Sequence, residues 1–237
     1  FDSNGGVRAP DWEQRIVELM KVAEGAYSLV IMTRDAIYAA RDPLGLRPLC
    51  YGEIPSDGNG PQGWMVGSES PALRTVGAEH MVDVEPGQIV RFDANGVHKF
   101  QGVPPNKKSA LCVFEYVYFA RPDTYLEGQT IHAARQRMGE RLAIESPVDA
   151  DVVIAVPDSS IPAAIGYGQV SGIPFTEGLI KNRYIGRTFI APSQRLRRDR
   201  VKLKYNVIRE NLQGKRVIVI DDSIVRGTTI GPLVRLI

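Results

Sequence analysis

Two adjacent carboxylates, Asp221 and Asp222, stand directly after four consecutive aliphatic residues, Val217–Ile220. Such a run is typical of a buried parallel strand, and open α/β sheets bind their ligands at the carboxyl ends of these strands. The next residues, 223–229, are rich in hydroxyl groups and glycine and lead into an expected helix. Free backbone N–H groups in such a turn, with the positive end of a helix dipole, suit a phosphate. The pattern therefore predicts a site for a ligand with hydroxyls at one end and a phosphate at the other, such as a ribose 5-phosphate.

A second turn follows another expected strand, the apolar run 152–156. It contains Asp158, Ser159 and Ser160 and enters a helix expected over 161–170. Taken alone, such a turn caps a helix more often than it binds a metal. Beside the first motif, the ligand interpretation is favoured, because a few hard oxygen ligands supplemented by phosphate and water suit Mg²⁺.

Cationic side chains are concentrated between residues 181 and 216. This stretch contains 12 Lys/Arg against two acids, Asp199 and Glu210, although the net charge of the whole chain is only +2. Such an excess attracts an anion, which is either a nucleic acid or a phosphorylated small molecule.

Length and composition exclude several classes of protein. The chain has 237 residues, 43% hydrophobic and 24% charged, which is an ordinary globular balance with room for one large domain or two smaller ones. No apolar run approaches the roughly 18 residues that span a bilayer. Two cysteines, Cys50 and Cys112, make no disulfide framework, so a cytoplasmic setting is expected. The start at Phe1 and the apolar, uncapped end indicate an internal fragment of a longer protein.

The first hundred residues predict one helix and then a series of short strands. Asp11 can cap the helix, whose apolar residues recur on one face, and Gly25 can end it. Asn95 and Gly96 form a strong hairpin signal, so we expect a mostly antiparallel arrangement. The expected strands, separated by turn residues, are 26–33, 36–40, 49–52, 64–67, 88–92 and 97–100.

After a candidate linker at 102–108, strands alternate with helices. This alternation predicts right-handed crossovers and a parallel sheet with both faces covered. The expected elements are a helix over 130–145, a strand over 152–156, a helix over 161–170, and strands over 175–180 and 217–220.

Residues 217–229 resemble the motif by which type I phosphoribosyltransferases bind 5-phosphoribosyl-1-diphosphate (PRPP). Their particular form, from Asp221 onward, is similar to that of the amidophosphoribosyltransferases. The resemblance implies that Asp221 and Asp222 contact the ribose hydroxyls and Mg²⁺. It also implies that the 5-phosphate is held by the following residues: Ser223, Ile224, Val225, Arg226, Gly227, Thr228 and Thr229.

Two further segments resemble the same family. Asp158, Ser159 and Ser160 are similar to its diphosphate loop, in which the position of Ser160 ligates Mg²⁺. Residues 181–189 resemble a loop that closes over bound PRPP, and closure excludes water and brings positive charge. The residues expected to act there are Lys181, Arg183 and Arg187.

The first half resembles an N-terminal-nucleophile glutaminase domain, on the strength of residues 41–48. The resemblance implies that Arg41 binds the α-carboxylate of glutamine, and a carboxylate is a suitable partner for a guanidinium group. Cys112 matches a position that ligates a [4Fe–4S] cluster in some members, although a structural role for this single cysteine is favoured. The family's nucleophile is an N-terminal cysteine, and this chain begins with Phe1, so we expect no glutamine hydrolysis from the chain as given.

The expected fold is therefore α/β and α+β. Residues 1–105 are assigned to a partial glutaminase domain with antiparallel sheets and helices, and residues 106–237 to a partial type I phosphoribosyltransferase domain with a parallel sheet. The implied activity is that of an amidophosphoribosyltransferase, a pentosyltransferase that makes 5-phosphoribosylamine, glutamate and diphosphate in the first step of purine (IMP) synthesis. Mg²⁺ is the implied cofactor, and a [4Fe–4S] cluster is expected only in some full-length relatives.

The expected partners are PRPP, glutamine, inhibitory purine nucleotides and further copies of the chain, with neither nucleic acid nor membrane. Two alternatives stay open. One is a PRPP-binding regulator whose basic loop contacts nucleic acid, which would show a steep salt dependence. The other is a salvage phosphoribosyltransferase that takes a free base, which the long antiparallel region before the linker disfavours.

Overall fold

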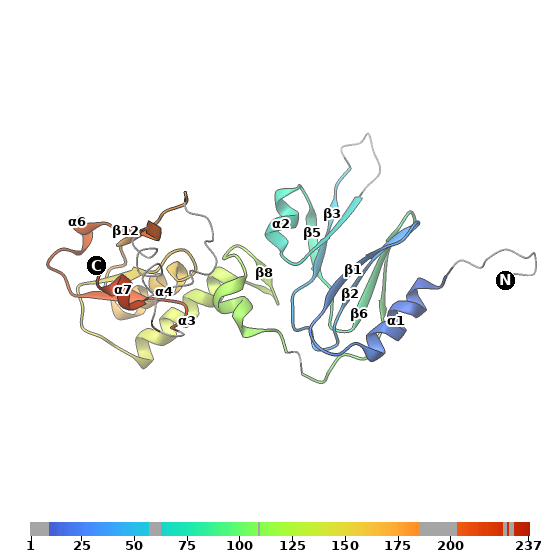
Figure 1. The fold of residues 1–237 in the computed structure, drawn as a ribbon, viewed down its shortest axis with the longest axis horizontal. Coiled ribbons are helices and arrows are strands. Elements are labelled where there is room, and N and C mark those ends of the chain that lie inside the picture. The colour runs from blue at the N-terminus through green and yellow to red at the C-terminus, as the bar shows by residue number, and fades with distance from the viewer. Residues whose placement is uncertain (1–9, 57–62, 109, 185–202, 225–226, 228–229) are drawn as a thin grey trace, which may run out of the picture. The chain divides into compact units, whose positions relative to one another are not determined.

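The computed structural model describes residues 10–237 except 57–62, 109, 185–202, 225–226 and 228–229 (Figure 1). The chain forms two compact units. The first runs to residue 115 and includes 124–128, and the second comprises 116–123 and 129–237. The described residues contain no helix that is long and apolar enough to cross a membrane.

The described residues of the first unit form two antiparallel sheets and two α-helices. One sheet has the strand order β1-β2-β6-β7, and the other has the order β4-β3-β5. The strands of the first sheet are β1 (Ser28–Met32), β2 (Ala36–Arg41), β6 (Gln88–Asp93) and β7 (Gly96–Gln101). The other elements are α1 (Trp12–Val22), β3 (Cys50–Ile54), β4 (Gly63–Gly67), α2 (Ser70–Thr75) and β5 (Glu79–Asp83).

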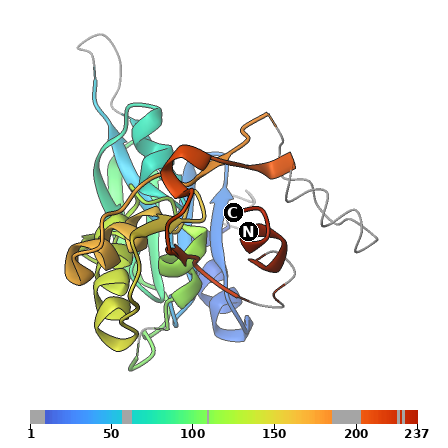
Figure 2. The ribbon, with the colours of Figure 1, turned by 90° about the vertical axis from the view of Figure 1, so that its left-hand side faces the viewer.

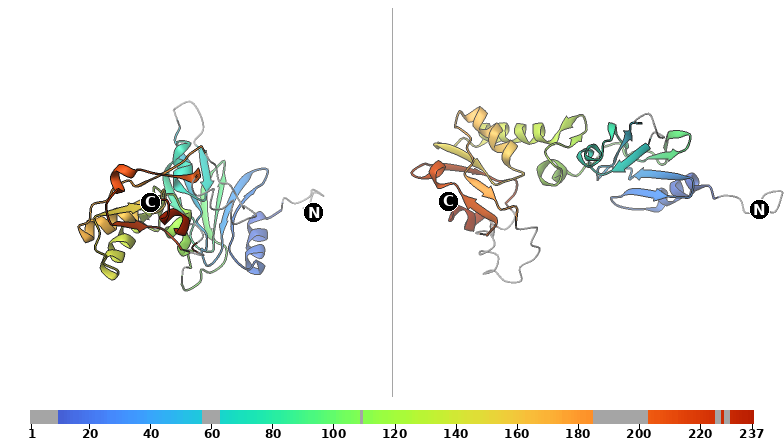
Figure 3. Two further views of the ribbon diagram at one scale, coloured as in Figure 1. Left: turned by 60° about the vertical axis from the view of Figure 1, so that its left-hand side comes forward. Right: turned by 90° about the horizontal axis from the view of Figure 1, so that it is seen from above.

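Alternation along the strands arranges these elements in four layers. In β2, Tyr38 and Ala40 pack with Ile16 of α1, whereas Ala39 points to the other face. That other face packs with Tyr51 of β3, so the two sheets share a core. The next residue of β3, Cys50, faces α2. Because successive side chains of a strand point to opposite faces, the order is α1, first sheet, second sheet, α2; Figure 3 gives two views of these strands and helices.

The second unit is built on the parallel pair β10 (Val152–Ala155) and β13 (Val217–Ile220). Helices α3 (Ile131–Glu145) and α4 (Ile161–Ser171) cover one face of the pair. The other face packs with the antiparallel ribbon β11 (Leu179–Lys181) and β12 (Tyr205–Val207) and with two short helices. These are α6 (Arg209–Leu212) and α7 (Ile230–Val234), which can be followed with the other elements by colour in Figure 2.

Three short elements precede α3 in the chain: η1 (Glu115–Phe119), β8 (Tyr125–Leu126) and β9 (Gln129–Thr130). Thr130 then caps α3, because its hydroxyl accepts a hydrogen bond from the N–H of Ala133 at 3.2 Å. Helix α4 also ends for a local reason, because Gly172 follows it with φ +73°, a left-handed conformation that glycine adopts at little cost.

Two glycines let α3 and α4 lie in close contact. A Cβ atom on Gly139 would stand 1.8 Å from the carbonyl oxygen of Ala163, and one on Gly166 would stand 2.0 Å from that of Gln136. Side chains at these positions would force the helices apart. Since α4 begins directly after Ser160, this contact also fixes the position of the turn at residues 158–160.

We predict that Gly139→Ala destabilises the protein by at least about 2 kcal/mol, because the added methyl group collides with backbone rather than with a flexible side chain. Thermal unfolding measures this as a loss of several degrees in Tm. The control is His132→Ala, an exposed position on the same helix, which should leave Tm nearly unchanged. Equal Tm values for Gly139→Ala and the wild type would contradict the packing described here.

The structure confirms the mixed fold class, with antiparallel sheets followed by a parallel pair. It also confirms that Asp11 caps the first helix, since its carboxylate accepts from the N–H of Gln14 at 3.0 Å. The single strand expected over 175–180 is wrong. Phe175 bridges Val153 in parallel, and β11 then pairs with β12 instead, so this segment is divided between two partners. The sequence analysis also missed α2 and β5, whose residues have no clear periodicity.

Candidate functional site

The register between β10 and β13 brings the two predicted ligand turns together. Ala155 lies opposite Ile220, and the N–H of Val156 donates to the carbonyl of Ile220 at 2.9 Å. Both strands run in the same direction, so the residues that follow them leave the sheet at one edge. This is the position at which open α/β sheets bind ligands.

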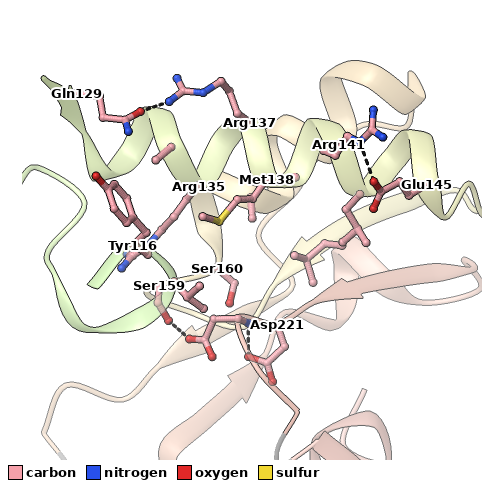
Figure 4. A pocket seen from close by; sticks show the side chains of 17 residues that line it. Tyr116, Gln129, Arg135, Arg137, Met138, Arg141, Glu145, Ser159, Ser160 and Asp221 are labelled. Atoms are coloured by element: carbon pink, nitrogen blue, oxygen red, sulfur yellow. Dashed lines mark hydrogen bonds and ion pairs between the residues drawn. The ribbon is translucent and has the colours of Figure 1, made fainter. Parts of the chain in front are cut away.

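Hydroxyl groups from the two turns meet the carboxylates. Ser159 Oγ, after β10, donates a hydrogen bond to the carboxylate of Asp222, after β13 (Figure 4). Ser223 Oγ donates to the other oxygen of the same carboxylate at 2.8 Å. Asp221 accepts from the N–H of Asp222 at 2.9 Å. The structure therefore joins Ser159, Asp221 and Asp222, which the sequence analysis placed in one site from two separate motifs.

Ser160 stands at the N-cap position of α4 without capping it. Its side chain makes no capping hydrogen bond, and the residue is 1% exposed. Its Oγ has no hydrogen-bond partner among the described residues. A buried hydroxyl without a partner costs free energy, so Ser160 Oγ has a hydrogen-bonding capacity that no described residue uses. The ordinary explanation of this serine as a helix cap does not apply.

These groups line one end of a pocket of about 690 Å³ in the second unit (Figure 4). The pocket extends from the strand ends along α3, where Met138 and Leu142 give it an apolar wall. Tyr116 and Gln129 line it as well. The pocket thus combines the carboxylates and hydroxyls of the two turns with apolar side chains and with charged residues of α3, among them Arg137, Arg141 and Glu145.

Arg135 of α3 is a residue of this pocket that the sequence analysis missed. It is 2% exposed, and its guanidinium donates to the carbonyls of Tyr116 at 2.6 Å and Ala120 at 2.8 Å. Burial lowers the pKa of this guanidinium, and the charge of Asp222 opposes that shift. Arg135 therefore holds residues 116–120 against α3 and places a buried cation near the acid pair. Its position on a helix of mixed polarity gave no signal for this role.

The two carboxylates stand close enough to disfavour a double negative charge. Burial, and then the charge of Asp222, raise the pKa of Asp221 above its ordinary value, while Lys204 lowers it. Raised carboxyl pKa values of this kind are common at functional sites, where a cation completes the charge balance.

The basic stretch reaches this site through Lys181. Its ammonium group lies 2.5 Å from the carboxylate of Asp158. Arg183 is exposed in the turn that follows. Gly227 has φ +65°, as expected for the turn after β13. The other predicted residues of the two loops, Val225, Arg226, Thr228, Thr229 and Arg187, lie outside the described residues.

We predict opposite stability effects for two aspartates at the two ends of the sheet, measured with a metal chelator present. The raised pKa of Asp221 means that the folded state loses stability as pH rises from an ordinary carboxyl pKa of about 3.9 through the raised value. Asp221→Asn removes this cost and should raise Tm at pH 7, with no gain below about pH 4.

Asp151 is the matched comparison, because hydrogen bonds from Arg216 lower the pKa of its carboxyl group. The stability that it contributes is present above the ordinary carboxyl pKa and is lost as pH falls through the lowered value. Asp151→Asn should therefore lower Tm at pH 7. A Tm change of the same sign in both variants would contradict the charge balance described here.

In the first unit, Arg41 is 5% exposed and bound to backbone. Its guanidinium donates to the carbonyl oxygens of Arg47 at 2.9 Å, Val84 at 2.8 Å and Gly45 at 3.0 Å. The neighbouring Asp42 carboxylate accepts from backbone N–H groups of the same turn. Arg41 thus holds the turn at 42–47 in place; its contact with glutamine stays a prediction.

We predict that Arg41→Lys lowers the free energy of unfolding by about 2 kcal/mol, since an ammonium group cannot replace three divergent hydrogen bonds to buried carbonyls. Chemical denaturation measures this loss. Lys99→Arg, an exchange of the same two residue types on the exposed part of β7, is the control. An unchanged free energy of unfolding for Arg41→Lys would show that the three bonds contribute little.

Both cysteines are free thiols in the described part of the chain. Cys50 is buried, and burial raises the pKa of its thiol to about 12. Cys112 is half-buried, and its carbonyl accepts from the N–H of Glu115 at 2.9 Å. A [4Fe–4S] cluster takes four cysteine ligands, so the two cysteines of this sequence do not fit one by themselves.

Comparisons with known proteins find similar sequences. The chain is 50% identical over 240 residues to the amidophosphoribosyltransferase of Mus musculus, with 97% of this chain and 46% of the relative covered. It is 49% identical over 225 residues to that of Mycobacterium tuberculosis, with 95% of this chain and 41% of the relative covered. The chain therefore spans about half the length of these relatives. No family model matches it.

Two solved structures are similar as well. One is described as the allosteric regulatory enzyme of purine biosynthesis, with a TM-score of 0.84, 43% identity, and coverage of 97% of this chain and 48% of that one. The other is the glutamine PRPP amidotransferase from B. subtilis complexed with ADP and GMP, with a TM-score of 0.83 and 42% identity over 97% of this chain and 50% of that one.

The fold and these matches are those of enzymes that are described as acting in purine biosynthesis or as PRPP amidotransferases, of which the chain spans about half. Over almost its whole length, the chain is a homologue of the amidophosphoribosyltransferases.

Proposed function

We propose that this chain carries the PRPP site of an amidophosphoribosyltransferase, which makes 5-phosphoribosylamine, glutamate and diphosphate from PRPP, glutamine and water. The observation that carries the proposal is the buried, unpartnered hydroxyl of Ser160, which lines the same pocket as Asp221 and Asp222. The comparisons support it, because the relatives described above are enzymes that bear this name. They give no support to a nucleic-acid-binding regulator.

The groups that follow the two strands each have a role in holding PRPP. The carboxylates of Asp221 and Asp222 accept hydrogen bonds from the ribose hydroxyls and orient the sugar. Their negative charge also stabilises the positive charge that develops at the anomeric carbon as the diphosphate departs. The backbone around Gly227 binds the 5-phosphate, and Asp158–Ser160 border the diphosphate.

Mg²⁺ fits the oxygen atoms at the strand ends. Ser160 Oγ, Asp221 and Asp222 are hard ligands, and they are fewer than the six that the ion takes, which leaves positions for diphosphate oxygens and water. The described residues hold no group of three or more acidic, His or Cys side chains of the kind that makes an all-protein metal cage. When bound, Mg²⁺ neutralises charge on the departing diphosphate.

The nitrogen of the product comes from glutamine, which binds in the glutaminase half of the protein. There, Arg41 is proposed to contact the α-carboxylate of glutamine, although its observed bonds are structural. Purine nucleotides are proposed as inhibitors, since one similar structure is a complex with ADP and GMP. Assembly into oligomers and location in the cytoplasm complete the proposal.

The test is the double variant Asp221→Asn, Asp222→Asn in the full-length protein. We expect its affinity for PRPP in the presence of Mg²⁺ to fall at least about 100-fold, because two charge-assisted contacts to the ligand are lost. Isothermal titration calorimetry measures the dissociation constant. Hydrolysis of glutamine should continue, since the glutaminase half is untouched.

The control is the double variant Glu177→Gln, Glu210→Gln, which removes the same charge from exposed positions in the same unit. It should bind PRPP like the wild type. Wild-type affinity in the Asp221, Asp222 variant would refute the proposed site.

A further inference from the structure

Two lysines stand at one end of the ribbon of β11 and β12: Lys181 is the last residue of β11, and Lys204 directly precedes β12, which is labelled in Figure 1. Lys181 lies opposite Tyr205 in the antiparallel register. The next pair continues the ribbon, because the N–H of Asn182 donates to the carbonyl of Lys204 at 2.8 Å. Lys204 is therefore a spatial neighbour of Lys181, although the whole segment 185–202 separates them in sequence.

Tyr205 shows that this ribbon lies beside the acid cluster. The residue is 4% exposed and belongs to the core under β10 and β13. Burial, and then the negative charges of Asp221, Asp222 and Asp158, raise the pKa of its hydroxyl to about 12, while Lys181 lowers it. All three carboxylates that border the proposed PRPP site are thus within electrostatic range of this one side chain.

Lys204 rests on that ring. Its ammonium nitrogen lies 5.0 Å from the centre of the Tyr205 ring, which is a cation–π contact. The residue is exposed, and no ion pair of Lys204 is found in the described part of the chain. Lys181, by contrast, is already bound to Asp158. Lys204 can therefore bind an incoming anion without breaking an ion pair of the described residues, and its charge acts on the acid pair, because it lowers the pKa of Asp221.

We propose that Lys204 binds the diphosphate group of PRPP in this site. The inference rests on the proposed function and adds a residue to it. Lys204 belongs to the basic stretch 181–216, which was expected to attract an anion, but it lies outside both phosphate motifs and outside the predicted loop 181–189. Physically, a diphosphate that departs with several negative charges requires cations besides Mg²⁺, and an exposed lysine held by an aromatic ring reaches it at little cost in conformational freedom.

The experiment compares Lys204→Gln, Lys204→Arg and the wild type in the full-length protein, with calorimetric titration of three ligands in the presence of Mg²⁺. For Lys204→Gln, we expect affinities for PRPP and for inorganic diphosphate to fall about tenfold, since one charge-assisted contact is lost. Affinity for ribose 5-phosphate should stay within about twofold, because that ligand has no diphosphate. Lys204→Arg, which keeps the charge, should retain most of the affinity.

Lys215→Gln is the matched control, because it removes the same charge from an exposed residue before the opposite end of β13. It should bind all three ligands like the wild type. Unchanged diphosphate affinity in Lys204→Gln overturns the inference, and so does an equal loss for ribose 5-phosphate, which would indicate a general effect on the site. If the wild type itself fails to bind PRPP, the proposed function fails as well, so the two failures are distinguishable.

Discussion

The parallel pairing of β10 with β13 is the constraint on which the site depends. Four residue pairs, from Val152 opposite Val217 to Ala155 opposite Ile220, bring both strands to an end at the same level. The aliphatic side chains hold this register, because alternate residues of β13 enter different cores: Val217 and Val219 pack on one face, and Ile218 and Ile220 on the other. A shift by one residue would exchange these faces. The same packing that stabilises the sheet therefore also aligns the two ligand turns.

The charges at this edge of the sheet lower the stability of the protein when no ligand is bound. Asp221 and Asp222 are adjacent, and Asp158 stands in the other turn. Three carboxylates are therefore gathered at this edge of the sheet. Arg135 and Lys181 offset part of this negative charge from neighbouring elements. Ser160 adds a buried hydroxyl without a partner. Such local costs are typical of sites that are completed by a ligand, and packing elsewhere in the domain compensates for them.

The helix pair α3 and α4 gives the site its rigid support. Gly139 and Gly166 allow the two backbones to approach closely, and this contact fixes the start of α4, where Ser160 lies. On the same helix α3, Arg135 binds the carbonyls of residues 116 and 120 and so determines one wall of the pocket. In the first unit, Arg41 has a comparable structural function, since its bonds to three carbonyls hold the turn that follows β2.

The sequence by itself determined the local features of this protein. The aliphatic runs, the capping residue Asp11 and the two ligand turns follow from side-chain chemistry within a few residues, and from these the mixed fold class and the acid pair could be predicted. The tertiary structure alone decided which distant groups meet. Arg135 and Lys204 carry no specific motif, because their positions depend on helix packing and on the pairing of strands that are distant in sequence. The strand expected over 175–180 divides between two partners for the same reason: the choice between β10 and β12 is made by contacts between segments far apart in the chain.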